Sequence, residues 1–332
     1  MKAQVIDQLL CKWLPRKSKI INGKNFTKDL IEFLSFSPKR YRKTLVTNTK
    51  VVESLMCANK WSEIEYSHVP SIASKNYANA FNRHDPSRYK SYLNSVMKGE
   101  AKMNASAIFP YDVCRGIFSN PEQADAQWKS LPNYLEGVNE RILTVCDVSG
   151  SMHGLPMEVS VSLGLYFSER LEGEFKDCVV TFSEQPKFVK LEGNTLSERY
   201  RNLSKIDWGY NTNFIKVFEV LLSVAKSGNV PEDHMPTKIL VVSDMQFDEA
   251  GSLTGYEKVV DLYRESGYTV PQLVFWNVAS NKAGNVPVKV GQRGVALVSG
   301  SSPAVVKSVL GAKLNPMDIM LDTVMKDRYN LS

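Results

Sequence analysis

Short apolar segments alternate with amphipathic segments from residue 141 onward, and this alternation constrains the fold more than any other feature. Runs typical of buried strands lie at 141–146, 179–182, 238–242, 272–278 and 294–298, with a shorter edge run at 188–191. Apolar residues at helical spacing lie between or after them, at 156–171, 212–225, 256–266, 302–310 and 317–326. Buried strands alternating with helices are typical of a mostly parallel sheet covered on both faces. We therefore expect an α/β fold with a doubly wound sheet.

The first 135 residues differ in pattern and in charge. Apolar residues at helical spacing predict short helices, among them one at 4–14 and one at 30–34 with Thr27 as its N-cap. No segment alternates convincingly like a strand. This part holds 21 Lys and Arg against 11 Asp and Glu, whereas the remainder is mildly acidic. We expect a smaller, basic helical domain over 1–135, an α/β domain over 138–312 and a C-terminal helix in 313–332.

Composition excludes several classes of protein. Hydrophobic residues make up 43% and charged residues 23% of the 332, which excludes a disordered, collagen-like or coiled-coil chain. No apolar run approaches the ~20 residues that a transmembrane helix needs, and no signal peptide is apparent. The cysteines are odd in number, and no two form a CxxC pair, which argues against a disulfide framework or a zinc site. We expect a reduced, cytoplasmic protein that does not engage membranes.

The basic excess of the first 135 residues allows two interpretations. A lysine-rich face is most simply a solvated surface. The same excess attracts phosphate polymers, because binding releases their counterions. The densest cluster is Lys39, Arg40, Arg42 and Lys43, and these four residues are the candidate RNA-binding set.

Oxygen-bearing side chains follow two of the expected strands and precede one expected helix. Asp147, Ser149 and Ser151 come directly after the run that ends at Cys146. Asp244 follows the run that ends at Val242, and Thr212 opens a helix. The carboxyl ends of the strands in a doubly wound sheet share one edge, so these five side chains are expected to converge. Their oxygens are hard donors, which suits Mg²⁺ or Mn²⁺. A loop whose serines and aspartate only cap the next helix is the alternative.

The spacing Asp147-x-Ser149-x-Ser151, followed by Thr212 and Asp244, resembles the metal-ion-dependent adhesion site of von Willebrand factor A domains. The resemblance covers about residues 138–312 and implies a Rossmann-like fold of that type. It implies that Ser149, Ser151 and Thr212 contact the metal and that the two aspartates often act through water. It also implies that an Asp or Glu of a protein ligand completes the coordination.

A closer resemblance runs over nearly the whole chain. It rests on several segments, including Val145–Met152, Trp208–Thr212, Ser243–Asp248, Trp13-Leu14-Pro15-Arg16 and Trp61–Ser71. These look like the uncharacterised Ro-related (TROVE-like) family of plants, bacteria and large DNA viruses. Ro-type proteins place a ring of helical repeats beside such a domain and bind small structured RNAs. The resemblance implies that residues 1–135 are a remnant of a Ro-like helical array.

Three classes of function follow from these observations. The first is a non-enzymatic, metal-dependent module for protein binding or assembly. The second is an RNA-binding, Ro-like ribonucleoprotein component that uses the basic helical half. The third is a metal-dependent hydrolase that uses Asp147 and Asp244, which the motif supports least because it offers no nucleophile or general base.

Overall fold

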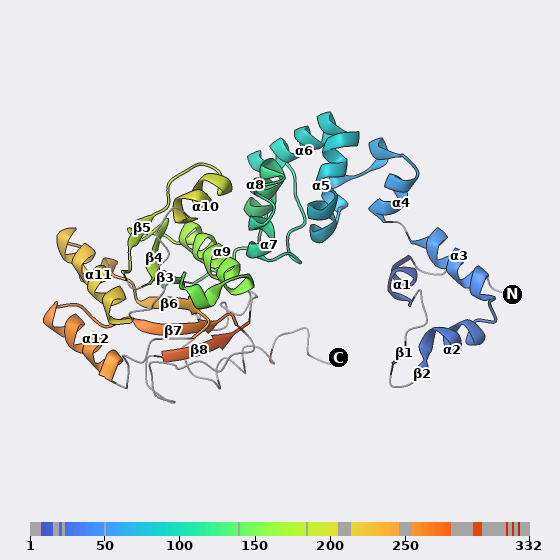
Figure 1. Cartoon of the computed structure of the whole chain (residues 1–332). Coiled ribbons are helices and arrows are strands. Elements are labelled where there is room, and N and C mark those ends of the chain that lie inside the picture. The colour runs from blue at the N-terminus through green and yellow to red at the C-terminus, as the bar shows by residue number, and fades with distance from the viewer. Residues whose placement is uncertain are drawn as a thin grey trace. The chain divides into compact units, whose positions relative to one another are not determined.

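The computed structural model describes most of the chain (Figure 1). The described residues are 8–15, 20–21, 24–49, 51–138, 140–183, 185–204, 214–245, 254–279 and 295–300, together with Met317, Leu321 and Met325. The chain forms two compact units, one of residues 1–66 with 83–86 and the other of residues 67–82 with 87–332. The boundary predicted between 135 and 138 stays a prediction.

The first unit is mainly helical around a small core. Cys11, Tyr41 and Leu45 form that core, and the Tyr41 hydroxyl donates to the carbonyl of Pro15 at 3.0 Å. The cap expected at Thr27 is wrong, because the side chain of Asn25 accepts from the Lys28 amide and the helix begins one residue earlier than Thr27. A two-stranded hairpin also lies here, which the sequence did not predict. The elements are α1 (Gln8–Trp13), β1 (Ile20–Ile21), β2 (Lys24–Asn25), α2 (Phe26–Phe33), α3 (Pro38–Asn48), α4 (Val52–Cys57) and the 3₁₀ turn η1 (Trp61–Glu63).

Helices also precede the sheet in the second unit. They are α5 (Ser71–His84, whose last two residues belong to the first unit), α6 (Pro86–Lys98), α7 (Pro110–Cys114) and α8 (Pro121–Lys129), and the 3₁₀ turn η2 (Tyr66–His68) leads into them. Proline stands at the first turn of α7 and α8, where its missing N–H costs nothing. The predicted helical part before the sheet is confirmed.

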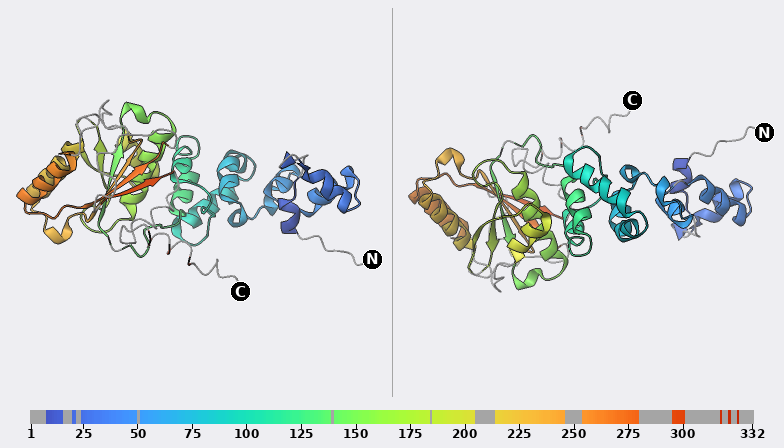
Figure 2. Two further views of the ribbon diagram at one scale, coloured as in Figure 1. Left: turned by 90° about the horizontal axis from the view of Figure 1, so that it is seen from below. Right: turned by 90° about the horizontal axis from the view of Figure 1, so that it is seen from above.

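A six-stranded sheet forms the centre of the second unit. Its strands are β3 (Ile142–Asp147), β4 (Cys178–Phe182), β5 (Phe188–Lys190), β6 (Lys238–Ser243), β7 (Gln272–Asn277) and β8 (Val295–Ser299). The spatial order is β5-β4-β3-β6-β7-β8, and all neighbours pair parallel except β5, which runs antiparallel at one edge. Figure 2 shows the twist of these strands in two views. The predicted α/β class with a doubly wound, mostly parallel sheet is confirmed.

Helices cover both faces of the sheet, as Figure 1 shows. Successive residues of a strand point to opposite faces of the sheet, so Cys146 of β3 packs in the hydrophobic cluster on one face and Val145 in the cluster on the other. The helices α9 (Leu155–Arg170) and α10 (Leu196–Ser204) cover the first face, and α11 (Phe214–Ser227) and α12 (Thr254–Glu265) cover the second. The 3₁₀ turns η3 (Gly150–Met152) and η4 (Glu232–His234) precede α9 and β6.

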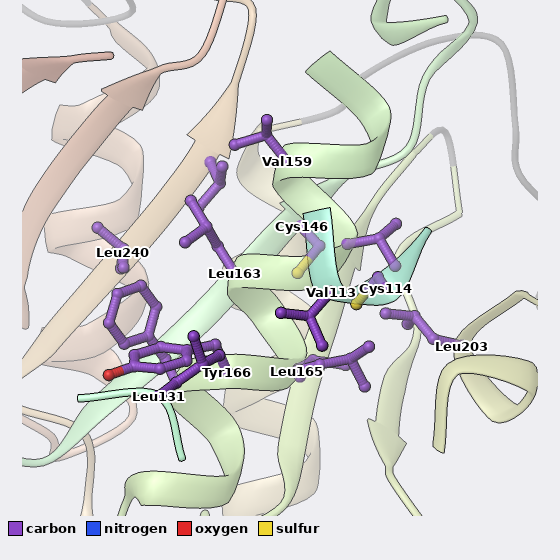
Figure 3. Close-up of a cluster of buried hydrophobic side chains, with 14 of the residues drawn as sticks. Val113, Cys114, Leu131, Cys146, Val159, Leu163, Leu165, Tyr166, Leu203 and Leu240 are labelled. Atoms are coloured by element: carbon purple, nitrogen blue, oxygen red, sulfur yellow. The ribbon is translucent and has the colours of Figure 1, made fainter. Parts of the chain in front are cut away.

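Helix α9 is held close to β3 by a glycine. A Cβ built on Gly164 would overlap the Sγ of Cys146, so only glycine fits this close approach. Side chains of α7 complete the same cluster, with Val113 and Cys114 beside those of α9 (Figure 3). The strand that ends at Asp147 is therefore packed tightly on this face.

The remaining points concern helix α10, the two expected C-terminal helices and membrane spans. Helix α10 was not predicted. The helix expected at 302–310 lies outside the described residues, as does that at 317–326 apart from Met317, Leu321 and Met325. Within the described part of the chain, no helix has both the length and the apolar character needed to cross a bilayer.

Candidate metal centre

The predicted site lies where the order of the strands in the sheet reverses, between β3 and β6. From β3 the chain builds outward through β4 and β5, and it then returns to place β6 on the other side of β3. The crevice at the carboxyl ends of two such strands is where doubly wound sheets bind ligands. Asp147 is the last residue of β3, and Asp244 directly follows β6. The structure therefore brings these two predicted residues to one place.

Asp147 is completely buried and held by hydrogen bonds on both oxygens. Its Oδ1 accepts from the backbone N–H of Ser149 at 2.9 Å, and its Oδ2 accepts from the hydroxyl of Ser243. The first bond is an Asx-type turn that redirects the chain after β3. The carboxylate is thereby fixed in orientation at the end of the strand.

Burial raises the pKa of Asp147 to about 6. The hydrogen bonds from Ser243 and Ser149 act in the opposite direction, and the nearby charge of Asp244 adds to the rise. Among the described residues, no lysine or arginine contributes to this shift. Two buried carboxylates close to one another, without a cationic side chain acting on Asp147, favour a site that takes a positive ion.

The two serine hydroxyls of the motif lie side by side. Their Oγ atoms form a hydrogen bond with each other, with the oxygens of Ser149 and Ser151 3.1 Å apart. Adjacent ligands of an octahedral ion with bonds of about 2.1 Å lie about 3 Å apart, so this spacing fits two neighbouring positions around Mg²⁺. The donor set of carboxylate and hydroxyl oxygens fits the same ion. The residues present therefore fit a hard divalent cation.

The alternative interpretation of the loop as a helix cap is wrong. Helix α9 has Gly154 as its N-cap and no side-chain capping bond. Ser149 precedes η3, and its side chain makes no capping bond either. The hydroxyls of the motif are thus not used to begin the next helix.

Asp244 is also completely buried, and its backbone is anchored across the site. Its N–H donates to the thioether sulfur of Met152 at 3.0 Å. Met245, which follows it, adopts a positive φ of 61°, unusual for a residue with a side chain. The chain therefore leaves β6 in a strained turn at the carboxylate, a feature that concentrates at functional sites.

One predicted site residue and two unpredicted ones remain to be placed. Thr212 lies outside the described residues. Ser243 and Met152, which contact the motif, were not among the predicted residues. Among the described residues, the candidate site included, no group of three or more His, Cys, Asp and Glu is arranged to hold a metal, so the candidate site depends on two aspartates and on hydroxyls.

The candidate RNA-binding residues lie together on α3, and all are exposed; they are Lys39, Arg40, Arg42 and Lys43. Tyr41 and Leu45 of the same helix point into the core of the first unit, so the basic side chains occupy the other face. The guanidinium of Arg40 lies over the ring of Phe36, 4.5 Å from its centroid. Ser37 caps the helix through its hydroxyl, which accepts from the Arg40 amide.

Comparisons with known proteins cover almost the whole chain. The model of the family described as Domain of unknown function (DUF7788) matches residues 141–328, and that of Domain of unknown function (DUF2828) matches residues 14–140. The uncharacterized protein L728 of Acanthamoeba polyphaga mimivirus is 28% identical over 346 aligned residues, which cover 96% of this chain and 60% of that protein. The chain thus spans about three fifths of the length of this relative.

Solved structures of low sequence identity resemble the chain in part. The Ro (RSR) protein of Deinococcus radiodurans is 13% identical with a TM-score of 0.39, covering 90% of this chain and 74% of that one. The VWA domain of SpRpn10 is 10% identical with a TM-score of 0.34, covering 58% of this chain and 98% of that one. The match over residues 141–328 spans more than half of the chain, which therefore belongs to the family of Domain of unknown function (DUF7788).

Proposed function

We propose that this chain is a metal-dependent binding module that recognises a carboxylate of a protein partner. In this proposal Asp147, Ser149, Ser151 and Asp244, together with Thr212, hold one Mg²⁺ or Mn²⁺ at the carboxyl end of the sheet. The bound ion supplies positive charge and an open coordination position. An Asp or Glu side chain of the partner takes that position.

The observation that carries this proposal is that two serine hydroxyls and two aspartates lie together at the carboxyl ends of β3 and β6, where the strand order of the sheet reverses. The serine oxygens are 3.1 Å apart, and both aspartates are fully buried. Ionised carboxylates are costly to bury unless they are paired or coordinate a metal. A hard cation bound here would neutralise both acids and would take both hydroxyls as ligands.

We propose a binding role and not a hydrolytic one. The serine hydroxyls that could act as nucleophiles are assigned to the ion, and a histidine-type base is not part of the motif. His153, two residues after Ser151, is exposed on the loop. We also propose the cytoplasm as the location of this protein, because its cysteines, Cys11, Cys57, Cys114, Cys146 and Cys178, form no disulfide, which suits a reducing compartment.

Titration calorimetry with Mn²⁺ tests the metal site. Ser149→Ala and Ser151→Ala each remove one hydroxyl, and each is expected to weaken Mn²⁺ binding by about ten-fold or more, a loss of about 1.4 kcal/mol of binding free energy. Ser162→Ala is the matched control, because Ser162 is a buried serine of α9 that bonds to the Val159 carbonyl. Unchanged affinity in both site variants, or no binding by the unaltered protein at millimolar Mn²⁺, would contradict the proposal.

RNA binding is a second candidate, favoured by the position of the basic residues on α3. Lys39 and Arg40 lie in its first turn, which contains no acidic residue. The partial positive charge of a helix N-terminus disfavours cations there, so helix stability does not explain this placement. Four exposed cations on one short segment fit the phosphates of a structured RNA.

Charge reversal tests the RNA interpretation. Replacing Lys39, Arg40, Arg42 and Lys43 by glutamate is expected to weaken binding to an RNA hairpin at least ten-fold and to flatten its salt dependence, since each lost phosphate contact lowers the salt slope by about one. Filter binding at several salt concentrations measures both. The control has the same change in charge at exposed residues of α11 and α12, namely Lys216, Lys226, Lys258 and Arg264. Equal affinity in the two variants would exclude α3 as the RNA contact.

A further inference from the structure

Ser243 occupies a central place in the candidate metal centre although it is not a predicted ligand. It is the last residue of β6 and is completely buried. Its hydroxyl donates to Oδ2 of Asp147 and accepts from the N–H of Met245 at 3.0 Å. One side chain thus fixes the carboxylate at the end of β3 and the turn that leaves β6.

A second contact crosses the site in the opposite direction. Met152 of η3 is completely buried, and its sulfur accepts the N–H of Asp244 at 3.0 Å. Ser243 reaches from β6 to Asp147 of β3, whereas Met152 reaches from the loop after β3 to Asp244, which follows β6. Each candidate metal-binding aspartate is therefore held by a residue from the other segment.

The strained turn at Met245 is consistent with such a role. A positive φ for a residue with a side chain persists only where the surroundings hold it. The hydroxyl of Ser243 accepts from the Met245 N–H, and the buried side chain of Met245 belongs to the hydrophobic cluster that also holds residues of α11 and α12. These contacts fix the backbone that carries Asp244.

We propose that Ser243 and Met152 are positioning residues that preorganise Asp147 and Asp244 for one cation, without contacting it themselves. The inference rests on the proposed function. Outer-shell partners of metal ligands typically change metal affinity by about 10- to 100-fold when they are removed. The two contacts also make the site a single unit, because neither aspartate can move without affecting the segment that carries the other.

The test compares two buried serines that differ in their contact with the site. Ser243→Ala is expected to weaken Mn²⁺ binding by about 10- to 100-fold. Ser160→Ala is the matched control, because the Ser160 hydroxyl bonds to the carbonyl of Val242, the residue before Ser243, and touches neither aspartate. The control is expected to keep its affinity within about two-fold while losing a similar amount of thermal stability. Ser243→Thr keeps a hydroxyl and is expected to recover most of the affinity.

Met152→Leu removes the sulfur acceptor at nearly constant volume and is expected to weaken Mn²⁺ binding several-fold. Thermal unfolding of each variant shows whether it has folded. If Ser243→Ala and Met152→Leu fold and bind Mn²⁺ as the unaltered protein does, this inference is overturned and the proposed function stands. If the unaltered protein binds no Mn²⁺, the proposed function is overturned and this inference with it.

Discussion

Replacing Asp147 by asparagine is expected to abolish cation binding and to stabilise the metal-free protein. At an effective dielectric of about 20, one unit charge about 4 Å from another contributes about 4 kcal/mol, so loss of this carboxylate removes at least two orders of magnitude of affinity. Asparagine has nearly the same shape and can still accept the N–H of Ser149. A change that removes binding while it strengthens the fold would mark Asp147 as a residue kept for function.

The expected gain in stability follows from the raised pKa. Burial raises the pKa of Asp147 from 3.8 to about 6, so at pH 7 the folded state holds a carboxylate in a place that favours the neutral form. The shift corresponds to about 3 kcal/mol, of which we expect asparagine to recover about 2 kcal/mol because its hydrogen bonds are weaker. For a domain of this size, that is a rise of about 5 °C in the melting temperature.

The same group predicts a pH dependence in the metal-free protein. Between the unfolded pKa of 3.8 and the folded pKa of about 6, the folded state binds the proton and the unfolded state does not. The contribution of Asp147 to the free energy of unfolding is therefore fully present below pH 4 and is lost as the pH rises through 6. Asp147→Asn lacks this contribution. Its gain in free energy of unfolding over the unaltered metal-free protein should therefore be largest at pH 7 and vanish near pH 4.

Thermal unfolding in EDTA at several pH values and calorimetry with Mn²⁺ measure these effects together. Asp112→Asn is a suitable control, because Asp112 is partly exposed and pairs with Lys75 at 2.9 Å, so its replacement removes an ion pair and not a fully buried charge. A lower melting temperature for Asp147→Asn at pH 7, with Mn²⁺ binding retained, would show that Asp147 is only a structural hydrogen-bond acceptor.

The centre of the sheet was predictable because its inner strands are buried on both faces. Strands β3 and β6 are buried at every position, so they appear in the sequence as short, mostly apolar runs that end at polar residues. Those polar residues, Asp147 and Asp244, mark the edge where ligands bind. The fold and two of the five candidate ligands thus share one local signal.

Contacts between distant residues account for what the sequence did not predict. Helix α10 buries only Leu196 and Leu203, and the N–H of Leu196 is satisfied by Asp125, 71 positions earlier. Ser243 and Met152 act on aspartates 96 and 92 positions away. No local pattern carries such pairings. The one sequence signal for Ser243 is a polar residue at the end of a buried strand, directly before Asp244.

Replacing Tyr166 by alanine is expected to cost the largest share of stability outside the candidate site. Tyr166 of α9 is completely buried, and its ring packs edge-on against Trp128 with centroids 6.1 Å apart. The guanidinium of Arg170 lies 3.9 Å from the centroid of the same ring. The hydroxyl accepts the N–H of Tyr134 at 3.0 Å and donates to the carbonyl of Pro132. One side chain thus fastens residues 128–134, which precede the sheet, to the helix that covers it.

Urea unfolding separates the two roles of this side chain. Tyr166→Ala should lower the free energy of unfolding by about 3–5 kcal/mol, the usual cost of a buried aromatic ring. Tyr166→Phe keeps the ring but leaves an N–H and a carbonyl unsatisfied, and it should lower the free energy of unfolding by about 1–3 kcal/mol. Tyr92→Phe, which loses an exposed bond to the Lys102 carbonyl, is the control. If Tyr166→Phe lowers the free energy of unfolding by no more than Tyr92→Phe does, the Tyr166 hydroxyl does not hold residues 128–134. Tyr166 lies near the opposite end of α9 from the candidate metal centre, so Tyr166→Phe should retain its Mn²⁺ affinity. The variant therefore separates loss of stability from loss of the site.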